Sequence, residues 1–151
     1  MCVHKIFFFG STMAQRRIEK EVSQLRKCQL TEFRSITRGQ DDFHYEVRLA
    51  GPEDSPYEGR VFVFNFVYPQ DYPFKPPKLN ATTRIYHCNI NAQGQMCQNI
   101  LQRDWSPTLN ITKVLTEVIS VLSLPFPDDS LDTEKAKLYK SNRKQYETNA
   151  R

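Results

Sequence analysis

The residues best suited to chemistry lie in one irregular stretch, residues 85–105, which reads IYHCNINAQGQMCQNILQRDW. It contains Cys88, Cys97 and His87 among several side-chain amides, and it has neither a helical nor an alternating apolar period. Unstructured stretches of about 20 residues inside a compact domain are uncommon and are usually functional or disordered. Apolar residues such as Ile85 and Trp105 could anchor this one to a core, which favours a functional loop.

A thiol in this loop could act as a nucleophile if it is reachable and becomes a thiolate. Cys97 follows a glycine and polar residues, which favours access. A cysteine–histidine dyad needs the histidine within hydrogen-bond reach, and His87 lies ten residues upstream with nothing in the spacing to bring it close. From the residues alone Cys97 and Cys88 both remain candidates, and a buried structural thiol is the alternative for each.

Composition excludes several classes of protein. The chain has 151 residues, 39% apolar and 25% charged, with a formal net charge of +4, as expected for one globular domain. No run of Lys and Arg is interleaved with aromatic residues, so we predict no nucleic-acid binding. The apolar run near the N-terminus is too short for a membrane span. We therefore expect residues 1–12 to form a flexible extension and residues 13–151 to form the folded domain.

The four cysteines are spaced without any CxxC pair. This argues against a zinc site and against a disulfide scaffold, and it predicts reduced thiols in the cytosol or nucleus. We expect no metal.

The rest of the chain predicts the elements that hold the loop. Helical periodicity predicts helices over residues 13–28, 111–124, 131–139 and 141–151, begun by Ser11 or Thr12, Asn110 and Ser141 where a capping residue is present. Runs with strand character predict strands over residues 33–36, 43–50, 61–67 and 79–83. The 61–67 strand has Val and Phe on both faces, so we expect both to be covered. Strands followed by helices predict an α+β two-layer sandwich with an antiparallel meander.

Two surfaces can be predicted from the same patterns. On the first helix, spacing alone predicts a solvated charged face made of Arg16, Arg17, Glu19, Lys20 and Glu21. Residues 68–78 read YPQDYPFKPPK, and four prolines restrict this segment to extended backbone. Prolines also reduce the freedom of the unfolded chain, so the loop could present Phe74 rigidly as a docking point.

Six motifs in order show a resemblance that covers residues 13–151. They are GPEDSPYEG from Gly51, YPxxYPFKPPK from Tyr68, TRIYHxNI from Thr83, GxxCxxIL from Gly94, WSPxLxIxKVL from Trp105 and PDD from Pro127. In this register the chain resembles the ubiquitin-conjugating enzymes, and it is most similar to the class that has only the core domain. The resemblance implies their fold: a four-stranded antiparallel meander with an N-terminal helix, a central helix and C-terminal helices.

The resemblance also implies an activity and a site. Cys97 falls at the catalytic position, where it would take ubiquitin from an activating enzyme as a thioester and pass it to a substrate lysine or a ligase cysteine. Asn89 would donate to the oxyanion or brace the loop. Asp129 would orient the incoming lysine, with Tyr86 and Leu131 lining its approach. No cofactor is implied, because ATP is consumed by the activating enzyme.

The resemblance implies two docking surfaces and a monomer that works in the cytoplasm and nucleus, with no membrane or nucleic-acid partner. Arg17, Phe74, Lys75, Ser106 and Pro107 match positions that dock RING, U-box or HECT ligases. Arg16, Arg17 and Lys20 match the basic face that meets the activating enzyme.

The sequence departs from the family pattern at several positions. Cys88 replaces the proline of the family's His-Pro-Asn motif, Asn99 replaces an acidic residue common two positions after the nucleophile, and Arg34 replaces a serine that some relatives use to bind ubiquitin noncovalently. These departures leave open two alternatives: a catalytically weakened scaffold that binds ligase or ubiquitin, or a carrier of a ubiquitin-like modifier.

Overall fold

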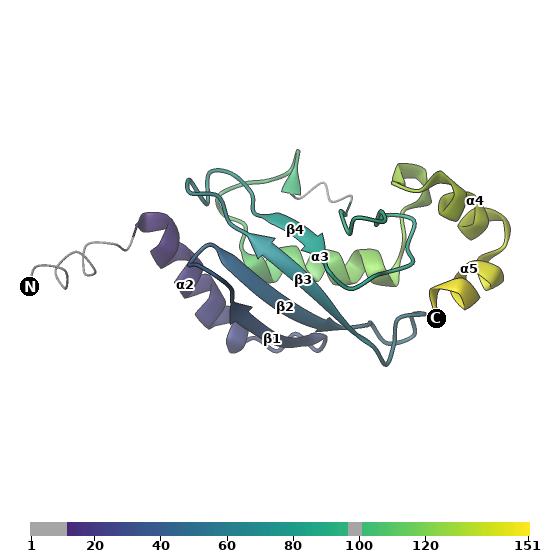
Figure 1. The fold of residues 1–151 in the computed structure, drawn as a ribbon, viewed down its shortest axis with the longest axis horizontal. Coiled ribbons are helices and arrows are strands. Elements are labelled where there is room, and N and C mark those ends of the chain that lie inside the picture. Colours follow the sequence, from purple (N-terminus) through teal and green to yellow (C-terminus); the bar gives the residue numbers. More distant parts are fainter. Residues whose placement is uncertain (1–11, 97–100) are drawn as a thin grey trace, which may run out of the picture.

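One antiparallel sheet in the order β1-β2-β3-β4 forms the first layer of the computed structural model (Figure 1). The structure describes residues 12–96 and 101–151. The strands are β1 (Phe33–Arg38), β2 (His44–Ala50), β3 (Val61–Val67) and β4 (Lys78–Ala81). Val47 pairs with Ile36 on one side and with Phe64 on the other. The predicted four-stranded meander is confirmed, although β1 continues two residues beyond its predicted end.

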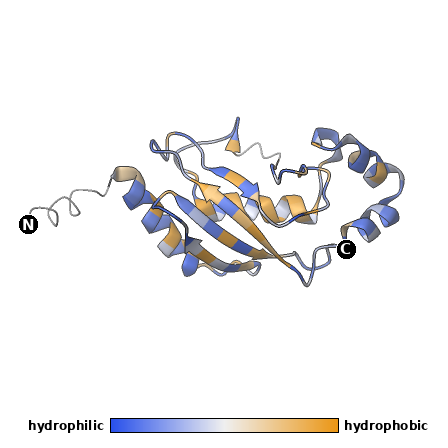
Figure 2. Cartoon of the chain, in the orientation of Figure 1, coloured by the Kyte–Doolittle hydropathy of each residue, from blue (hydrophilic) through white to orange (hydrophobic). Residues whose placement is uncertain are grey.

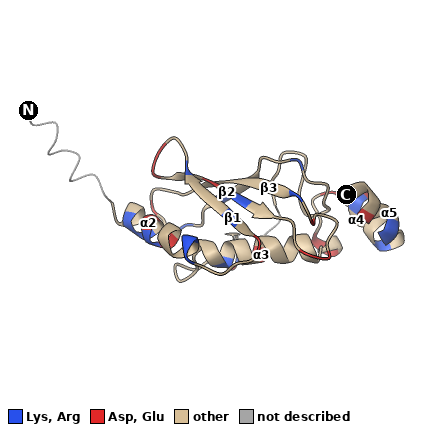
Figure 3. Cartoon of the chain, turned by 90° about the horizontal axis from the view of Figure 1, so that it is seen from below, with Lys and Arg blue, Asp and Glu red and all other residues tan. Residues whose placement is uncertain are grey.

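Helices α2 (Met13–Arg26) and α3 (Ile111–Ser123) pack against one face of this sheet (Figure 3). On that face the alternation in β2 and β3 buries Tyr45, Val47, Leu49, Phe62, Phe64 and Phe66. The other face of β3 is open, since Val61 is 48% exposed and Asn65 is exposed. The prediction that β3 is covered on both sides was therefore wrong. Val and Phe favour strands whether or not a second layer follows.

The predicted caps of both large helices are present. Thr12 accepts a hydrogen bond from the Gln15 backbone N–H and its own N–H donates to the Gln15 side chain, a reciprocal capping box. Asn110 accepts from the Lys113 backbone N–H at 2.9 Å. The apolar stripe of α3 is visible in Figure 2 and faces the core. Within residues 12–96 and 101–151, every helix is too short or too polar to cross a membrane.

The C-terminal elements lie at one end of the molecule (Figure 1). They are a short 3-10 helix, η2 (Pro127–Asp129), followed by α4 (Thr133–Ser141) and α5 (Arg143–Ala150). Helix α4 begins after Asp132, whose side chain accepts from the Lys135 N–H, rather than at residue 131. The prediction that Ser141 caps the last helix was wrong, because Asn142 accepts from the Gln145 N–H and caps α5.

The described part of the 85–105 stretch is tied to the sheet edge. The Ala81 N–H donates to the Gly94 carbonyl at 2.8 Å, and Asn80 forms an antiparallel bridge with Gln95. Gly94 has a φ of +82°. A Cβ at this position would lie 2.0 Å from the Ala81 carbonyl oxygen, so the loop can approach β4 only through a glycine.

Gly94→Ala should destabilise the fold far more than Gly59→Ala. Gly59 has nearly the same φ, +85°, but a Cβ there would meet nothing within 4 Å. Gly59→Ala should cost about 1–2 kcal/mol from the left-handed backbone alone. Gly94→Ala should cost ~1–3 kcal/mol more because of the clash. Urea unfolding of the two variants measures the difference, and equal losses would contradict the close approach.

Candidate functional site

The Asn89 side chain joins two loops that are distant in sequence. Its amide nitrogen donates to the carbonyl oxygens of Phe126 at 2.8 Å and Asp129 at 3.0 Å. Its amide oxygen accepts from the Phe126 N–H at 2.8 Å. The side chain is buried, with 1% exposure. Both N–H groups are thus used to hold η2 against the loop.

His87 is fixed as a neutral ring under the same turn. Its Nδ1 accepts from the Asn89 N–H at 2.9 Å, so the Nε2–H donates to the Val121 carbonyl at 2.9 Å. Burial, helped by nearby Lys135, lowers the pKa of His87 to about 4. Because both ring nitrogens have structural partners, His87 is not available here as a base for a cysteine.

Cys88 is a buried structural thiol. Its sulfur donates to the Asn89 amide oxygen at 3.4 Å, and burial raises the pKa of the thiol. The Cys88 carbonyl accepts from the Leu131 and Asp132 N–H groups, and its own N–H donates to the Tyr146 hydroxyl at 3.1 Å. Burial and a raised pKa both oppose a nucleophilic role.

The predicted nucleophile, Cys97, and Asn99 lie outside the described residues. Met96 immediately precedes Cys97, and it forms an antiparallel bridge with Ile90, the residue after Asn89. The described chain therefore runs from the Asn89 turn to the residue before Cys97 through one paired segment.

Three other predicted site residues surround the 87–89 turn. Asp129 is exposed at the end of η2, and Leu131 is 44% exposed beside it. Tyr86 is half-buried, with its ring centroid 5.3 Å from that of Tyr146 and 4.8 Å from the Lys135 ammonium. The sequence had pointed to neither Tyr146 nor Lys135, since only the packing of α4 and α5 brings them here.

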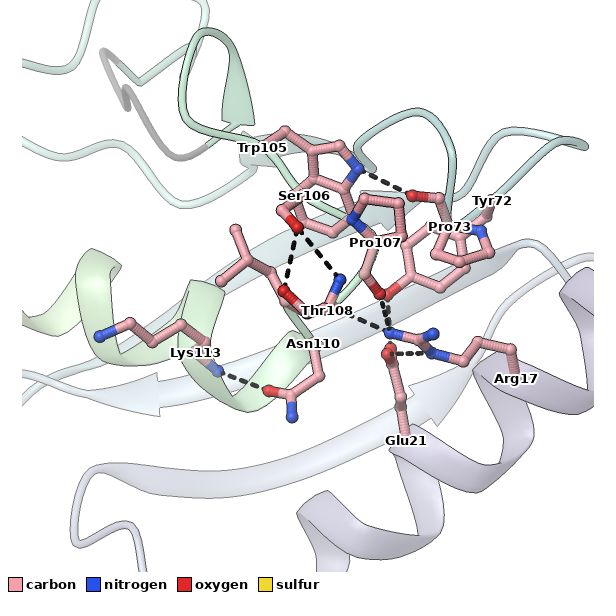
Figure 4. A network of polar contacts seen from close by, with 11 residues as sticks. Arg17, Glu21, Tyr72, Pro73, Trp105, Ser106, Pro107, Thr108, Asn110 and Lys113 are labelled. Atoms are coloured by element: carbon pink, nitrogen blue, oxygen red, sulfur yellow. Dashed lines mark hydrogen bonds and ion pairs between the residues drawn. The ribbon is translucent and has the colours of Figure 1, made fainter.

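A second group of predicted residues meets where α2 approaches the loops before α3 (Figure 4). The Arg17 guanidinium donates to the carbonyl oxygens of Pro107 at 2.6 Å and Leu109 at 3.0 Å. The Trp105 indole N–H donates to the Pro73 carbonyl at 2.9 Å. These bonds fix the 68–78 loop and the 105–110 loop side by side.

The predicted docking side chains are displayed along these loops. Phe74 is 75% exposed, as the proline pattern had predicted. Lys75 is exposed and pairs with Asp71 at 3.5 Å. Pro107 is exposed, and the half-buried Ser106 hydroxyl lies 2.9 Å from that of Thr108. Arg17, Phe74, Lys75, Ser106 and Pro107 thus belong to one assembled surface.

The predicted solvated face of α2 needs correction at Glu21. This carboxylate is 3% exposed and accepts from the Arg17 guanidinium at 2.9 Å and from the Tyr72 hydroxyl at 2.6 Å. Glu21 follows Arg17 by one helical turn, and the pair faces the 68–78 loop rather than water. Arg16 and Lys20 are exposed on α2.

The match to a known family agrees with this geometry. A family model described as ubiquitin-conjugating enzyme matches residues 17–151. The chain therefore belongs to the ubiquitin-conjugating enzyme family, and its function is of the ubiquitin-conjugating transferase kind. The family implies interaction with ubiquitin, with an activating enzyme and with ligases in general. In the described part of the chain, no cluster of three or more His, Cys, Asp or Glu residues could hold a metal ion.

His87 should make stability depend on pH. Unfolded His87 gains a proton below about pH 6.5, whereas folded His87 does so only near pH 4. Stability is therefore full above pH 6.5 and falls by about 1.4 kcal/mol for each pH unit as the pH drops to about 4. Urea unfolding across this range should show the slope in wild type and in His44→Asn, but not in His87→Asn. A slope that persists in His87→Asn would assign it to another group.

Proposed function

We propose that this chain carries ubiquitin as a thioester on Cys97 and transfers it to lysine together with a ligase. The Cys97 thiolate attacks the thioester carbonyl of ubiquitin on the activating enzyme, and the thiolate of that enzyme leaves. A substrate amine then attacks the new thioester, Cys97 leaves as thiolate, and the amine loses a proton. The protein itself needs no cofactor, because ATP is used by the activating enzyme. It acts as a monomer in the cytoplasm and nucleus.

The Asn89 brace is the observation that carries this proposal. The Asn89 amide holds Asp129, and the Cys88 carbonyl holds Leu131, against the turn that follows Tyr86 and leads through Ile90 and Met96 to Cys97. An acyl carrier needs its acceptor-binding residues held beside the thioester, since positioning supplies much of the rate of such a transfer. This geometry fits transfer from Cys97 to a lysine at Asp129.

Of the two roles considered for Asn89, the brace has the stronger support. Both amide N–H groups donate to backbone carbonyls, those of Phe126 and Asp129. An oxyanion donor would have to release one of these part-buried bonds, which leaves a backbone carbonyl without its partner. Asn89 therefore acts by holding η2 in place.

Asp129 then serves the incoming amine. Free lysine has a pKa of about 10.4, so it is almost wholly charged at neutral pH. A carboxylate alone favours the charged form, whereas an apolar surface favours the neutral one. Tyr86 and the partly exposed Leu131 supply such a surface, and the exposed Asp129 orients the amine or accepts its proton.

The Arg17–Pro107 junction supports ligase docking, whether the ligase is of the RING, U-box or HECT type. Arg17, Phe74, Lys75, Ser106 and Pro107 form the docking surface on loops whose backbones are hydrogen-bonded together. A basic face on α2 is formed by Arg16, Arg17 and Lys20. Such a face suits an acidic surface of the activating enzyme.

A charging assay tests the proposal. With activating enzyme, ATP and ubiquitin, wild type should form an adduct that a reducing agent cleaves. Cys97→Ala should form none, because the acyl acceptor is missing, whereas Cys88→Ala should still form it. If wild type forms no adduct but binds ubiquitin or a ligase, the protein is a scaffold. If it forms one only with a ubiquitin-like modifier, the carrier alternative holds.

Asp129→Ala should slow discharge of the charged protein to free lysine by about tenfold or more while charging continues, as expected for loss of one acid–base group. Asp128→Ala is the matched control, since Asp128 is the adjacent exposed carboxylate and pairs with Lys140. Single-turnover discharge of the preformed thioester measures both. Equal rates for the two variants would remove the role of Asp129.

A further inference from the structure

Two buried phenols each make a hydrogen bond to the backbone of the 86–88 segment. Cys88 N–H donates to the Tyr146 hydroxyl oxygen at 3.1 Å. Tyr57 lines the same small cavity as Tyr146. The Tyr57 hydroxyl donates to the Tyr86 carbonyl at 2.5 Å. One buried phenol thus accepts from the N–H of Cys88, and the other donates to the carbonyl of Tyr86, two residues earlier.

The residues joined by these hydrogen bonds come from three separate parts of the fold. Tyr146 lies on α5, Tyr57 lies in the turn between β2 and β3, and Tyr86 and Cys88 flank His87. Tyr146 and Tyr57 are each 1% exposed, so their hydroxyls cannot turn to bulk water instead. Burial raises the pKa of both phenols, which keeps them protonated and able to donate.

The hydrogen bond to Tyr146 depends on residue 88 having a backbone N–H. Proline has none, and its ring fixes φ near −65° by itself. Cys88 leaves the turn conformationally freer, but it adds a donor that a proline would lack. The Cys88 carbonyl also accepts hydrogen bonds from the backbone N–H groups of Leu131 and Asp132. These bonds hold the segment that follows Asp129 against the turn.

We propose that Tyr146 of α5 is a positioning residue for the 86–89 turn, with Tyr57 holding the Tyr86 side of that turn, and that the hydrogen bond of Tyr146 to the Cys88 N–H takes the place of a proline. Through this bond the last helix holds the turn from which Asn89 reaches η2. The thiol of Cys88 has no part in the device; its backbone N–H does. The part of this inference that concerns transfer rests on the proposed function.

A double-mutant cycle separates positioning from general stability. Tyr146→Phe keeps the ring and removes the hydroxyl, so it should slow single-turnover discharge to lysine by about threefold to tenfold, the usual worth of one such bond. It should slow discharge equally in a Cys88→Ala background, which retains the N–H. In a Cys88→Pro background it should have no effect, because the donor is already absent and proline restrains the turn.

Two further variants test whether the effect on discharge belongs to the Tyr146 hydroxyl. Tyr139→Phe removes a hydroxyl from the ring that packs edge-on against Tyr146, with centroids 5.0 Å apart, and it should change discharge by less than Tyr146→Phe does. Tyr57→Phe removes the hydroxyl that donates to the Tyr86 carbonyl and should slow discharge in the same direction. If Tyr146→Phe does not fold, Cys88→Pro is compared with Cys88→Ala, and a proline variant that discharges more slowly contradicts the proposal.

Amide exchange on the uncharged protein provides a readout that does not need activity. The Cys88 amide proton should exchange slowly in wild type and Tyr139→Phe, and about threefold or more faster in Tyr146→Phe. The proposal is overturned if Cys88 exchange is unchanged in Tyr146→Phe, or if discharge falls as much in the proline background as in wild type. If wild type forms no thioester, the proposed function fails, and Cys88 exchange still decides whether Tyr146 holds the turn.

Discussion

The buried Asn89 amide is the constraint on which the site depends. One side chain donates twice and accepts once across an interval of about 40 residues. Without it, the backbone groups of Phe126 and Asp129 would lose their partners. Because these bonds are part-buried, the cost per group lies below the ~1–3 kcal/mol of a fully buried unsatisfied group. Because Asn89 sits between His87 and Ile90, whatever fixes that turn also fixes η2, Asp129 and the start of α4.

The same physical device appears at the other end of the molecule. There the Arg17 guanidinium satisfies the carbonyls of Pro107 and Leu109, and Glu21 holds both Arg17 and Tyr72. Both sites consist of loops, and in both a side chain from another element completes the loop's backbone hydrogen bonds. Loops often carry functional residues, but they are usually more mobile than the helices and strands that they connect. Polar side chains anchored on α2 and in the 87–90 turn let these loops keep defined shapes.

Cys88 shows why a substitution must be judged by the backbone groups of the residue as well as by its side chain. As a thiol nine residues before Cys97 it suggests a second nucleophile, but the structure buries it and burial raises its pKa. The group with consequences is the backbone N–H that a proline would lack, since it engages Tyr146. The C-terminal helix is thereby linked to the Asn89 turn, although no motif in the sequence connects them.

The sequence by itself determined two kinds of feature: local structure, and positions identified by the order and spacing of motifs. Alternation in β2 and the caps at Thr12 and Asn110 are set within a few residues, and ordered motifs single out Cys97, which lies outside the described residues. Tertiary structure decided what depends on contacts between distant segments. Glu21 looks like a surface carboxylate until the 68–78 loop covers it, and β3 looks covered on both sides until the helices occupy only one. The amide hydrogens of Asn89 have no assigned partner until Phe126 and Asp129 accept them. Period and composition describe one segment at a time, whereas a buried polar group is defined by its partner.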